Sequence, residues 1–197
     1  MTRFIDFNHD ATSLARRLLG TTLVRVADEG RCAGVIVETE AYLGVVDRAA
    51  HTFGGRRTAR NASMWLEGGH AYVYFTYGMH WCFNVVAGPA DEPIAVLVRA
   101  LRPCEGVATM RARRGVERES LLCAGPARLA QALAIDRTLD GEDLRRSERL
   151  FIESAAPAAS REIVASRRIG VDYAGAWAAR RLRFSLRSER RWWSAPA

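Results

Sequence analysis

The sequence predicts a mixed α+β domain built on an antiparallel sheet. Short apolar segments alternate with turn residues, which is typical of antiparallel strands. Three further segments favour helices, and two of them have a clear start. The chain has 197 residues, of which 49% are hydrophobic and 26% charged, and this is ordinary globular usage. We therefore expect one domain over residues 1–197, with a basic C-terminal segment at 157–197.

The expected strands are apolar runs of five to ten residues. They cover 21–27, 33–42, 70–76, 80–87, 94–101 and 182–186. The third and fourth runs are separated by a turn at Tyr77-Gly78 and predict a hairpin. Beyond Glu153 the chain is rich in Ala, Arg and Ser and is weakly patterned until the last of these runs.

The expected helices have recognisable ends. Asp10 can cap a helix that runs to Leu19, with Gly20 as its stop. Residues 105–114 favour a second helix. A third, at 127–135, is entered through Gly125-Pro126, and proline suits the first helical turn.

The charge of the chain favours a polyanionic partner. The net charge is +7, and residues 157–197 contribute +6 of it through nine arginines and three carboxylates. Every basic residue is arginine, since the sequence contains no lysine. Arginine binds phosphate bidentately but cannot serve as an amine nucleophile. A solvated arginine-rich surface explains the composition equally well.

Several classes of protein are not supported. No apolar run is long enough to cross a bilayer, and residues 1–10 lack the apolar stretch of a signal peptide. The four cysteines are scattered without a C-x-x-C pair, so reduced thiols are expected rather than disulfides, zinc or an iron–sulfur cluster. We expect a bacterial cytoplasmic protein without contact to a membrane.

Two carboxylates are expected to share a strand face. Strict alternation in residues 35–42 puts Glu38, Glu40 and Tyr42 on one face. The other face would carry Val35, Val37, Thr39 and Ala41. The strand alone supports a structural ion-pair network and a catalytic role equally. An acidic site within a basic protein favours catalysis, because cations would hold the substrate on which a carboxylate acts.

Aromatic residues accompany the only histidine that lies near this strand in sequence. His51 follows Tyr42, and Tyr72, Tyr74 and Tyr77 come next along the chain. Such a group can form a stacking pocket for a planar base, although core packing of the hairpin explains the first tyrosines as well. Tyr77 at the turn is expected to protrude, as a side chain that fills the gap left by an extruded nucleotide would.

These residues stand in longer motifs that resemble the 3-methyladenine (alkyladenine) DNA glycosylase family. The resemblance covers roughly residues 14–186. Its motifs are Val-Glu-Thr-Glu-Ala-Tyr-Leu-Gly at 37–44, His51 with Gly-Gly-Arg at 54–56 and Thr-x-Arg-Asn at 58–61, Tyr-Val-Tyr-x-x-Tyr-Gly-Met at 72–79, Asn84, Val-Arg-Ala at 98–100, Leu-Cys-x-Gly-Pro at 122–126 and Ile-Gly-Val at 169–171. It implies a compact single domain with a curved antiparallel sheet flanked by helices, acting as a monomer without metal or organic cofactor.

The resemblance also implies a role for individual residues. Glu40 would be the general base that deprotonates a water, which Arg99 and the backbone carbonyl of Ile169 would help to hold. Tyr42, His51 and Tyr74 would contact the flipped base, and Tyr77 would intercalate into the duplex. Asn84 would sense the minor-groove edge of the purine; from the residues alone, a buried hydrogen bond explains Asn84 as well. Glu38 has no such role and is expected to be structural.

The expected activity is excision of alkylated or deaminated purines from double-stranded DNA in base-excision repair. The enzyme would be monofunctional, because without lysine the usual Schiff-base route to strand cleavage is closed. Its place of action would be the bacterial nucleoid.

Two alternatives stay open: a carbohydrate glycosidase that uses Glu38 and Glu40 as an acid–base pair, and a non-catalytic nucleic-acid binding module. A zinc deaminase is excluded, since neither H-x-E nor P-C-x-x-C occurs.

Overall fold

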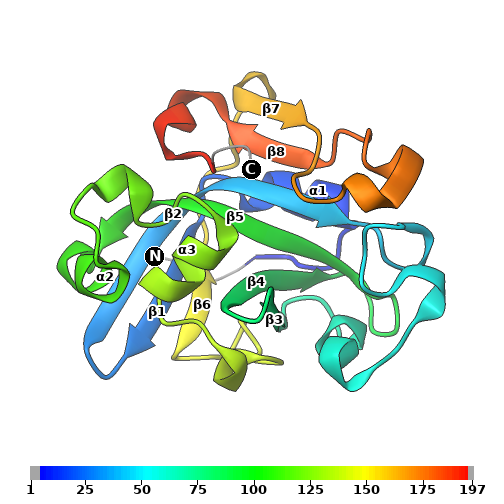
Figure 1. Cartoon of the computed structure of the whole chain (residues 1–197), viewed down its shortest axis with the longest axis horizontal. Coiled ribbons are helices and arrows are strands. Elements are labelled where there is room, and N and C mark those ends of the chain that lie inside the picture. Colours follow the sequence, from blue (N-terminus) through cyan, green and yellow to red (C-terminus); the bar gives the residue numbers. More distant parts are fainter. Residues whose placement is uncertain (1–4, 195–197) are drawn as a thin grey trace.

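One long strand organises the sheet. The computed structural model describes residues 5–194 and contains an eight-stranded antiparallel sheet. Strand β2 (Gly30–Tyr42) pairs with β5 (Ile94–Glu105) along one edge. Its other edge pairs first with β1 (Thr22–Ala27) and then with β8 (Arg183–Leu186), so that the sheet curls around β2 (Figure 1).

The remaining strands extend the sheet on both sides. Strands β3 (Ala71–Thr76) and β4 (His80–Ala87) form the expected hairpin, and β4 pairs with β5. Two four-residue edge strands were not predicted from sequence: β6 (Leu150–Glu153) pairs with β1, and β7 (Ile163–Ser166) pairs with β8. Strands β6 and β7 lie in a weakly patterned part of the chain and take their conformation from the strands beside them.

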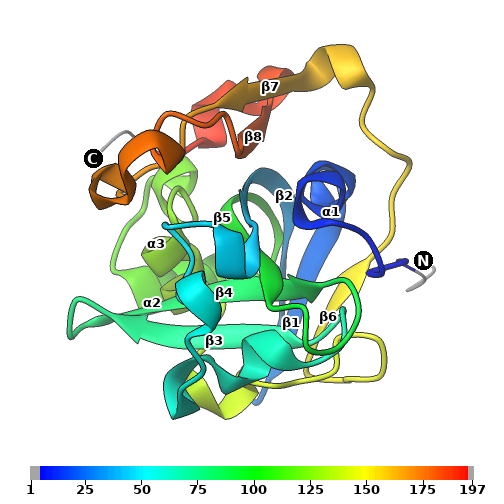
Figure 2. The same cartoon turned by 90° about the vertical axis from the view of Figure 1, so that its right-hand side faces the viewer.

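Within residues 5–194, three α-helices flank the sheet. Helix α1 (Ala11–Leu18) is capped by Asp10, whose carboxylate accepts hydrogen bonds from the amides of Thr12 (2.9 Å) and Ser13 (3.0 Å). Figure 2 shows α1 on one side of β2 and β5, with α2 (Val107–Arg114) and α3 (Pro126–Ala132) on the other. The predicted helices and the predicted mixed α+β class are confirmed. No helix of the described residues is both long and apolar enough to cross a membrane.

Two of the three irregularities in the β2–β5 pairing lie next to Glu38, beside the site. Ile36 pairs with Leu101, Glu38 with Ala100 and Thr39 with Val98. One residue on each strand, Val37 and then Arg99, is therefore left without a partner. Such bulges redirect side chains and are common beside active sites.

The irregularity at Val37 makes the strict alternation predicted for residues 35–42 wrong. Val37 packs with Val35, Ala100 and Trp192, whereas Ala41 lies in the main hydrophobic core. The hydroxyl of Thr39 donates to the carbonyl of Ala15 in α1 (2.9 Å). The extra residue lets Val37 and Glu38 be neighbours in sequence and still both lie away from the main core.

Candidate active site

An aromatic cavity opens between the β3–β4 hairpin, strand β5 and the segment that follows β7. Its volume is about 310 Å³, at the small end of ligand pockets, and suits one planar base better than an oligosaccharide. Seven of the eight residues proposed from sequence line it: Tyr42, His51, Tyr74, Tyr77, Asn84, Arg99 and Ile169. Figure 2 shows the hairpin turn projecting at the left, below the segment that precedes β8.

Glu40, the eighth, lies directly behind the cavity wall. Its carboxylate is fully buried and is held by three groups. Oε1 accepts from the amide of Ile169 (2.8 Å) and lies 3.2 Å from Nη1 of Arg99, and Oε2 accepts from the hydroxyl of Tyr42 (2.9 Å). All three holding residues line the cavity, so the groups that fix the carboxylate are also exposed to whatever the cavity binds.

Ile169 makes a contact that the resemblance did not name. The resemblance assigns a role to its carbonyl, whereas the structure shows its amide donating to Glu40. That donor fixes the carboxylate and ties the segment after β7 to strand β2. The role of the carbonyl toward a water stays a prediction.

Arg99 is buried between two carboxylates. Besides Glu40, its Nε lies 3.9 Å from Oε1 of Glu38. Burial by itself lowers the pKa of the guanidinium, but the charges of Glu40 and Glu38 outweigh it and raise the pKa of Arg99. Arg99 is therefore a permanent cation beside Glu40, able to orient a water or stabilise an anion.

Three aromatic rings form one wall of the cavity. Tyr72 and Tyr74 stack with ring centroids 5.2 Å apart, and His51 meets Tyr74 edge-on at 4.6 Å. Burial raises the pKa of both tyrosines far above the ordinary value, so their hydroxyls stay protonated. The wall is therefore uncharged and offers π-faces, which attract a cationic purine.

His51 is held neutral. Burial, and then the nearby cations Arg60 and Arg56, lower the pKa of its imidazole to about 4. Its Nδ1 lies 2.7 Å from the hydroxyl of Tyr72. The side-chain amide of Asn61 donates to the backbone carbonyl of His51 (3.1 Å) and anchors the loop that carries the histidine.

Asn84 and Tyr77 occupy contrasting positions. Asn84 is buried, and its side-chain amide donates to the carbonyl of Tyr72 (2.9 Å), so it both satisfies a buried acceptor and faces the cavity. Tyr77 is 82% exposed at the hairpin turn, with a positive φ of 53°. An exposed aromatic side chain on a strained backbone lowers the stability of the fold, and such strain is typical of functional sites.

Glu38 does not reach the cavity. Its carboxylate is fully buried and accepts hydrogen bonds from Ser194 and Arg183, on the far side of Arg99. An acid–base pair acting on one sugar needs both carboxyl groups at the substrate. The alternative of a carbohydrate glycosidase using Glu38 and Glu40 is not favoured.

The structure adds residues that sequence reasoning did not assign to the site. Arg168 and Asp47 form a fully buried pair, with Nη2 of the arginine 2.9 Å from Oδ1 of the aspartate. The same guanidinium lies 4.8 Å from the ring centroid of Tyr42 and fixes that ring from outside the cavity. Tyr173, 69% exposed, stands on the cavity rim. Arg168 directly precedes the Ile-Gly-Val motif and Tyr173 follows two residues after it, which is the only sequence signal for them.

A second cavity of about 320 Å³ adjoins the first across His51. The arginines Arg48, Arg56 and Arg60 contribute to its lining. Guanidinium groups are common contacts of DNA phosphates, and these three lie beside a base-sized pocket. Among the residues that the structure describes, no three of His, Cys, Asp and Glu gather as metal ligands would.

A basic chain whose aromatic cavity covers a buried, hydrogen-bonded carboxylate has the features of a DNA glycosylase. The comparison with family models agrees: the model of methylpurine-DNA glycosylases (MPG) matches residues 5–190. The chain belongs to the methylpurine-DNA glycosylase family.

Individual relatives cover nearly all of the chain. The DNA-3-methyladenine glycosylase of Mus musculus is 45% identical over 90% of this chain and 56% of its own, and that of Homo sapiens is 43% identical over 92% and 64%. A bacterial relative from Natranaerobius thermophilus, named as a candidate 3-methyladenine DNA glycosylase, is 39% identical over 92% of both chains. The present chain thus spans little more than half of the mouse protein.

Proposed function

We propose that the protein flips alkylated or deaminated purines out of duplex DNA and hydrolyses their N-glycosidic bond with a water activated by Glu40. The observation that carries this proposal is the buried carboxylate itself. It is held by Arg99, Tyr42 and Ile169, and each of these also faces the cavity. A base in the cavity would therefore bring its sugar close to a water held against Glu40.

The reaction needs one general base, the carboxylate of Glu40, and one water; the leaving group is the purine. As the bond between C1′ and the purine nitrogen breaks, its electron pair leaves with the base. The water oxygen bonds to C1′. One of its protons passes to Glu40, and the other stays on the new hydroxyl group. The product is an abasic site, and the strand stays intact because the chain has no lysine to form an imine with the sugar.

The lining of the cavity favours alkylated purines. Methylation at N3 or N7 gives the purine a positive charge, which makes it a good leaving group and suits the faces of Tyr42 and Tyr74. A neutral lesion such as hypoxanthine needs a proton on departure, and His51, with a pKa of about 4, does not supply one at neutral pH. We propose that cationic lesions react faster than neutral ones.

The decisive variant is Glu40→Gln. Glutamine keeps the shape and an oxygen to accept from Ile169, but it cannot take a proton. Single-turnover excision of ethenoadenine or hypoxanthine from duplex, revealed by alkali cleavage of abasic sites, should fall by about 10²–10⁴. Affinity for lesion-containing DNA should change little. A rate within tenfold of the parent protein would remove Glu40 from the role of base.

The partner that this proposal requires is double-stranded DNA containing a damaged purine. We propose that one copy of the chain binds one lesion, in a bacterial cytoplasm at the nucleoid. Size-exclusion chromatography with a lesion-containing duplex tests the stoichiometry: one protein for each duplex is expected, and two would contradict the monomer.

A further inference from the structure

We propose that Glu38 and Ser194 are positioning residues that fix the guanidinium of Arg99 beside Glu40, and that Glu38 shares the charge of that guanidinium with Glu40. The end of the chain, residues 187–194, would then be part of the catalytic centre, although none of these residues lines the cavity. This inference rests on the proposed role of Glu40 as the base.

Glu38 is fixed by three hydrogen bonds. Its Oε2 accepts from the amide (2.7 Å) and the hydroxyl (2.6 Å) of Ser194, and its Oε1 accepts from Nη1 of Arg183 (2.7 Å). The carboxylate and Ser194 are both buried. Charged hydrogen bonds in a buried setting are the strong ones, so Glu38 has one well-defined position.

The hydroxyl of Ser194 links this carboxylate to Arg99. It donates to Glu38 and accepts from Nε of Arg99 at 3.4 Å, which uses both capacities of a hydroxyl. At its other end Arg99 brings Nη1 to 3.2 Å from Glu40. The guanidinium is therefore held at both ends, by the Glu38–Ser194 pair behind it and by the proposed base in front.

The charges of the cluster balance. Glu38 and Glu40 contribute two negative charges, and Arg99 and Arg183 contribute two positive ones. If Glu38 lost its charge, Arg99 would interact with Glu40 alone and bind it more tightly. A carboxylate so neutralised is a poorer proton acceptor for water.

The charged and titratable groups that interact electrostatically with the two carboxylates come from several elements. They are Arg99 from β5, Arg183 from β8, Arg168 from the segment after β7, Tyr42 from β2, Tyr74 from β3, Cys82 from β4 and Tyr173 from the turn at Asp172–Trp177. None of them is changed in the variants below. A shift in pH dependence can thus be traced to Glu38.

Two variants separate position from charge. Ser194→Ala keeps the amide donor and every charge but removes the link to Arg99. Its single-turnover rate on ethenoadenine duplex should fall about tenfold, with the acid limb of the pH–rate profile unmoved. Glu38→Gln should lower the plateau of the pH–rate profile at least as much as Ser194→Ala does. It should also move the acid limb of that profile to lower pH.

Two controls come from the same C-terminal segment. Glu189→Gln removes a contact to Arg102 (2.9 Å) that lies outside the cluster, and Ser188→Ala changes an exposed serine. Both should excise at the parent rate. Thermal unfolding of all four variants shows how far stability alone changes.

The outcomes distinguish this inference from the proposed function. If the parent protein excises no damaged base, the proposed function fails. If the parent excises and Glu40→Gln does not, but Ser194→Ala and Glu38→Gln keep the parent plateau and acid limb, the positioning role is wrong. Glu38 and Ser194 would then only fasten the C-terminal segment, and their loss would appear in the unfolding temperature alone.

Discussion

Asn84 shows how one side chain can serve the fold and the site together. Its amide satisfies the carbonyl of Tyr72, and it also lines the cavity. Guanine differs from adenine and hypoxanthine by a 2-amino group, and a fixed amide facing that edge would reject it by overlap and by an unpaired donor.

Asn84→Ser should therefore raise excision of undamaged guanine relative to hypoxanthine. The change also leaves the Tyr72 carbonyl without its donor, which should cost about 1–3 kcal/mol of stability. The ratio of the two excision rates separates these effects, because lost stability lowers both together. An unchanged ratio would place the discrimination against guanine elsewhere in the cavity.

His51 makes a second prediction at this scale, on stability against pH. Its folded pKa of about 4 lies below the ordinary value of 6.5, so the unfolded chain binds a proton that the native protein does not. The contribution of neutral His51 is complete above pH 6.5 and is lost as pH falls toward 4. Over that window we expect roughly 2–3 kcal/mol from this residue.

Denaturant unfolding of the parent protein and of His51→Gln at pH 7, 5.5 and 4 measures this contribution. The variant should lose less stability between pH 7 and 4 than the parent protein does. Parallel losses would show that folding leaves the pKa of His51 near its ordinary value, and a proton for neutral leaving groups would then be available close to neutral pH.

At the scale of elements, the β3–β4 turn combines strain with exposure. Tyr77 adopts a left-handed backbone conformation, which costs a residue with a side chain about 1–2 kcal/mol. Asparagine tolerates this region better. Tyr77→Asn should leave thermal stability equal or higher while excision from duplex falls, because stacking is worth about 1–3 kcal/mol per base.

A lesion placed opposite a gap tests this prediction, because there is no stack to rebuild after the base leaves. Excision from that substrate should be close to the parent rate. If Tyr77→Asn loses excision equally on both substrates, Tyr77 acts on the cavity rather than on the duplex.

The elements differ in how far the sequence could predict them. The helix capped by Asp10 and the hairpin around Tyr77 carry local signals and were predicted. Strand β7 carries no pattern of its own and depends on β8. Val37 and Arg99 are unpaired because of the register between β2 and β5, which lie far apart in sequence. Strict alternation within one strand therefore assigned residues near Val37 to the wrong face of the sheet.

The same limit applies to the site. The family motifs name the residues around the cavity, but they do not show which of them touch. The pair of Asp47 and Arg168 joins residues 121 positions apart, and the contacts of Glu38 with Ser194 span 156. Long-range pairs of this kind depend on the assembled sheet, and a single sequence contains no sign of them.

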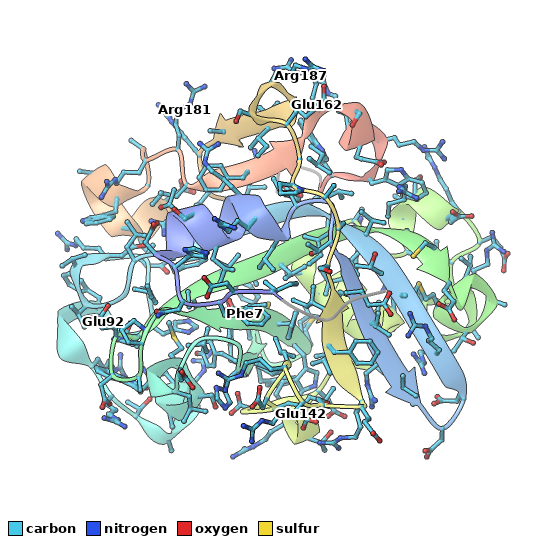
Figure 3. All side chains as sticks on the ribbon, turned by 180° about the vertical axis from the view of Figure 1, so that it is seen from behind. Phe7, Glu92, Glu142, Glu162, Arg181 and Arg187 are labelled. Carbon is cyan, nitrogen blue, oxygen red and sulfur yellow. The ribbon has the colours of Figure 1, made fainter. Side chains whose placement is uncertain are left out.

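At the scale of the whole molecule, the structure divides the arginines into internal and free ones. From the sequence, the basic segment 157–197 was a candidate for contact with a polyanionic partner, with a solvated surface as the alternative. Arg183, however, is committed to Glu38 and to the carbonyl of Arg167. Figure 3, seen from behind, shows Arg181 and Arg187 projecting from the edge of the fold formed by β7 and β8. The exposed Arg48 and Arg56, by contrast, line the cavity next to His51.

We therefore expect phosphate binding to concentrate around Arg48 and Arg56. The logarithm of affinity for undamaged duplex falls with the logarithm of salt by about 0.9 for each phosphate neutralised. Replacing both arginines with glutamine should reduce that slope by up to about 1.8. The matched double variant Arg187→Gln/Arg190→Gln removes the same charge from the C-terminal segment and should leave the slope near the parent value. Fluorescence anisotropy between 50 and 200 mM salt measures the slopes of both double variants. A slope reduced only in the Arg187/Arg190 variant would show that DNA binds the C-terminal segment instead.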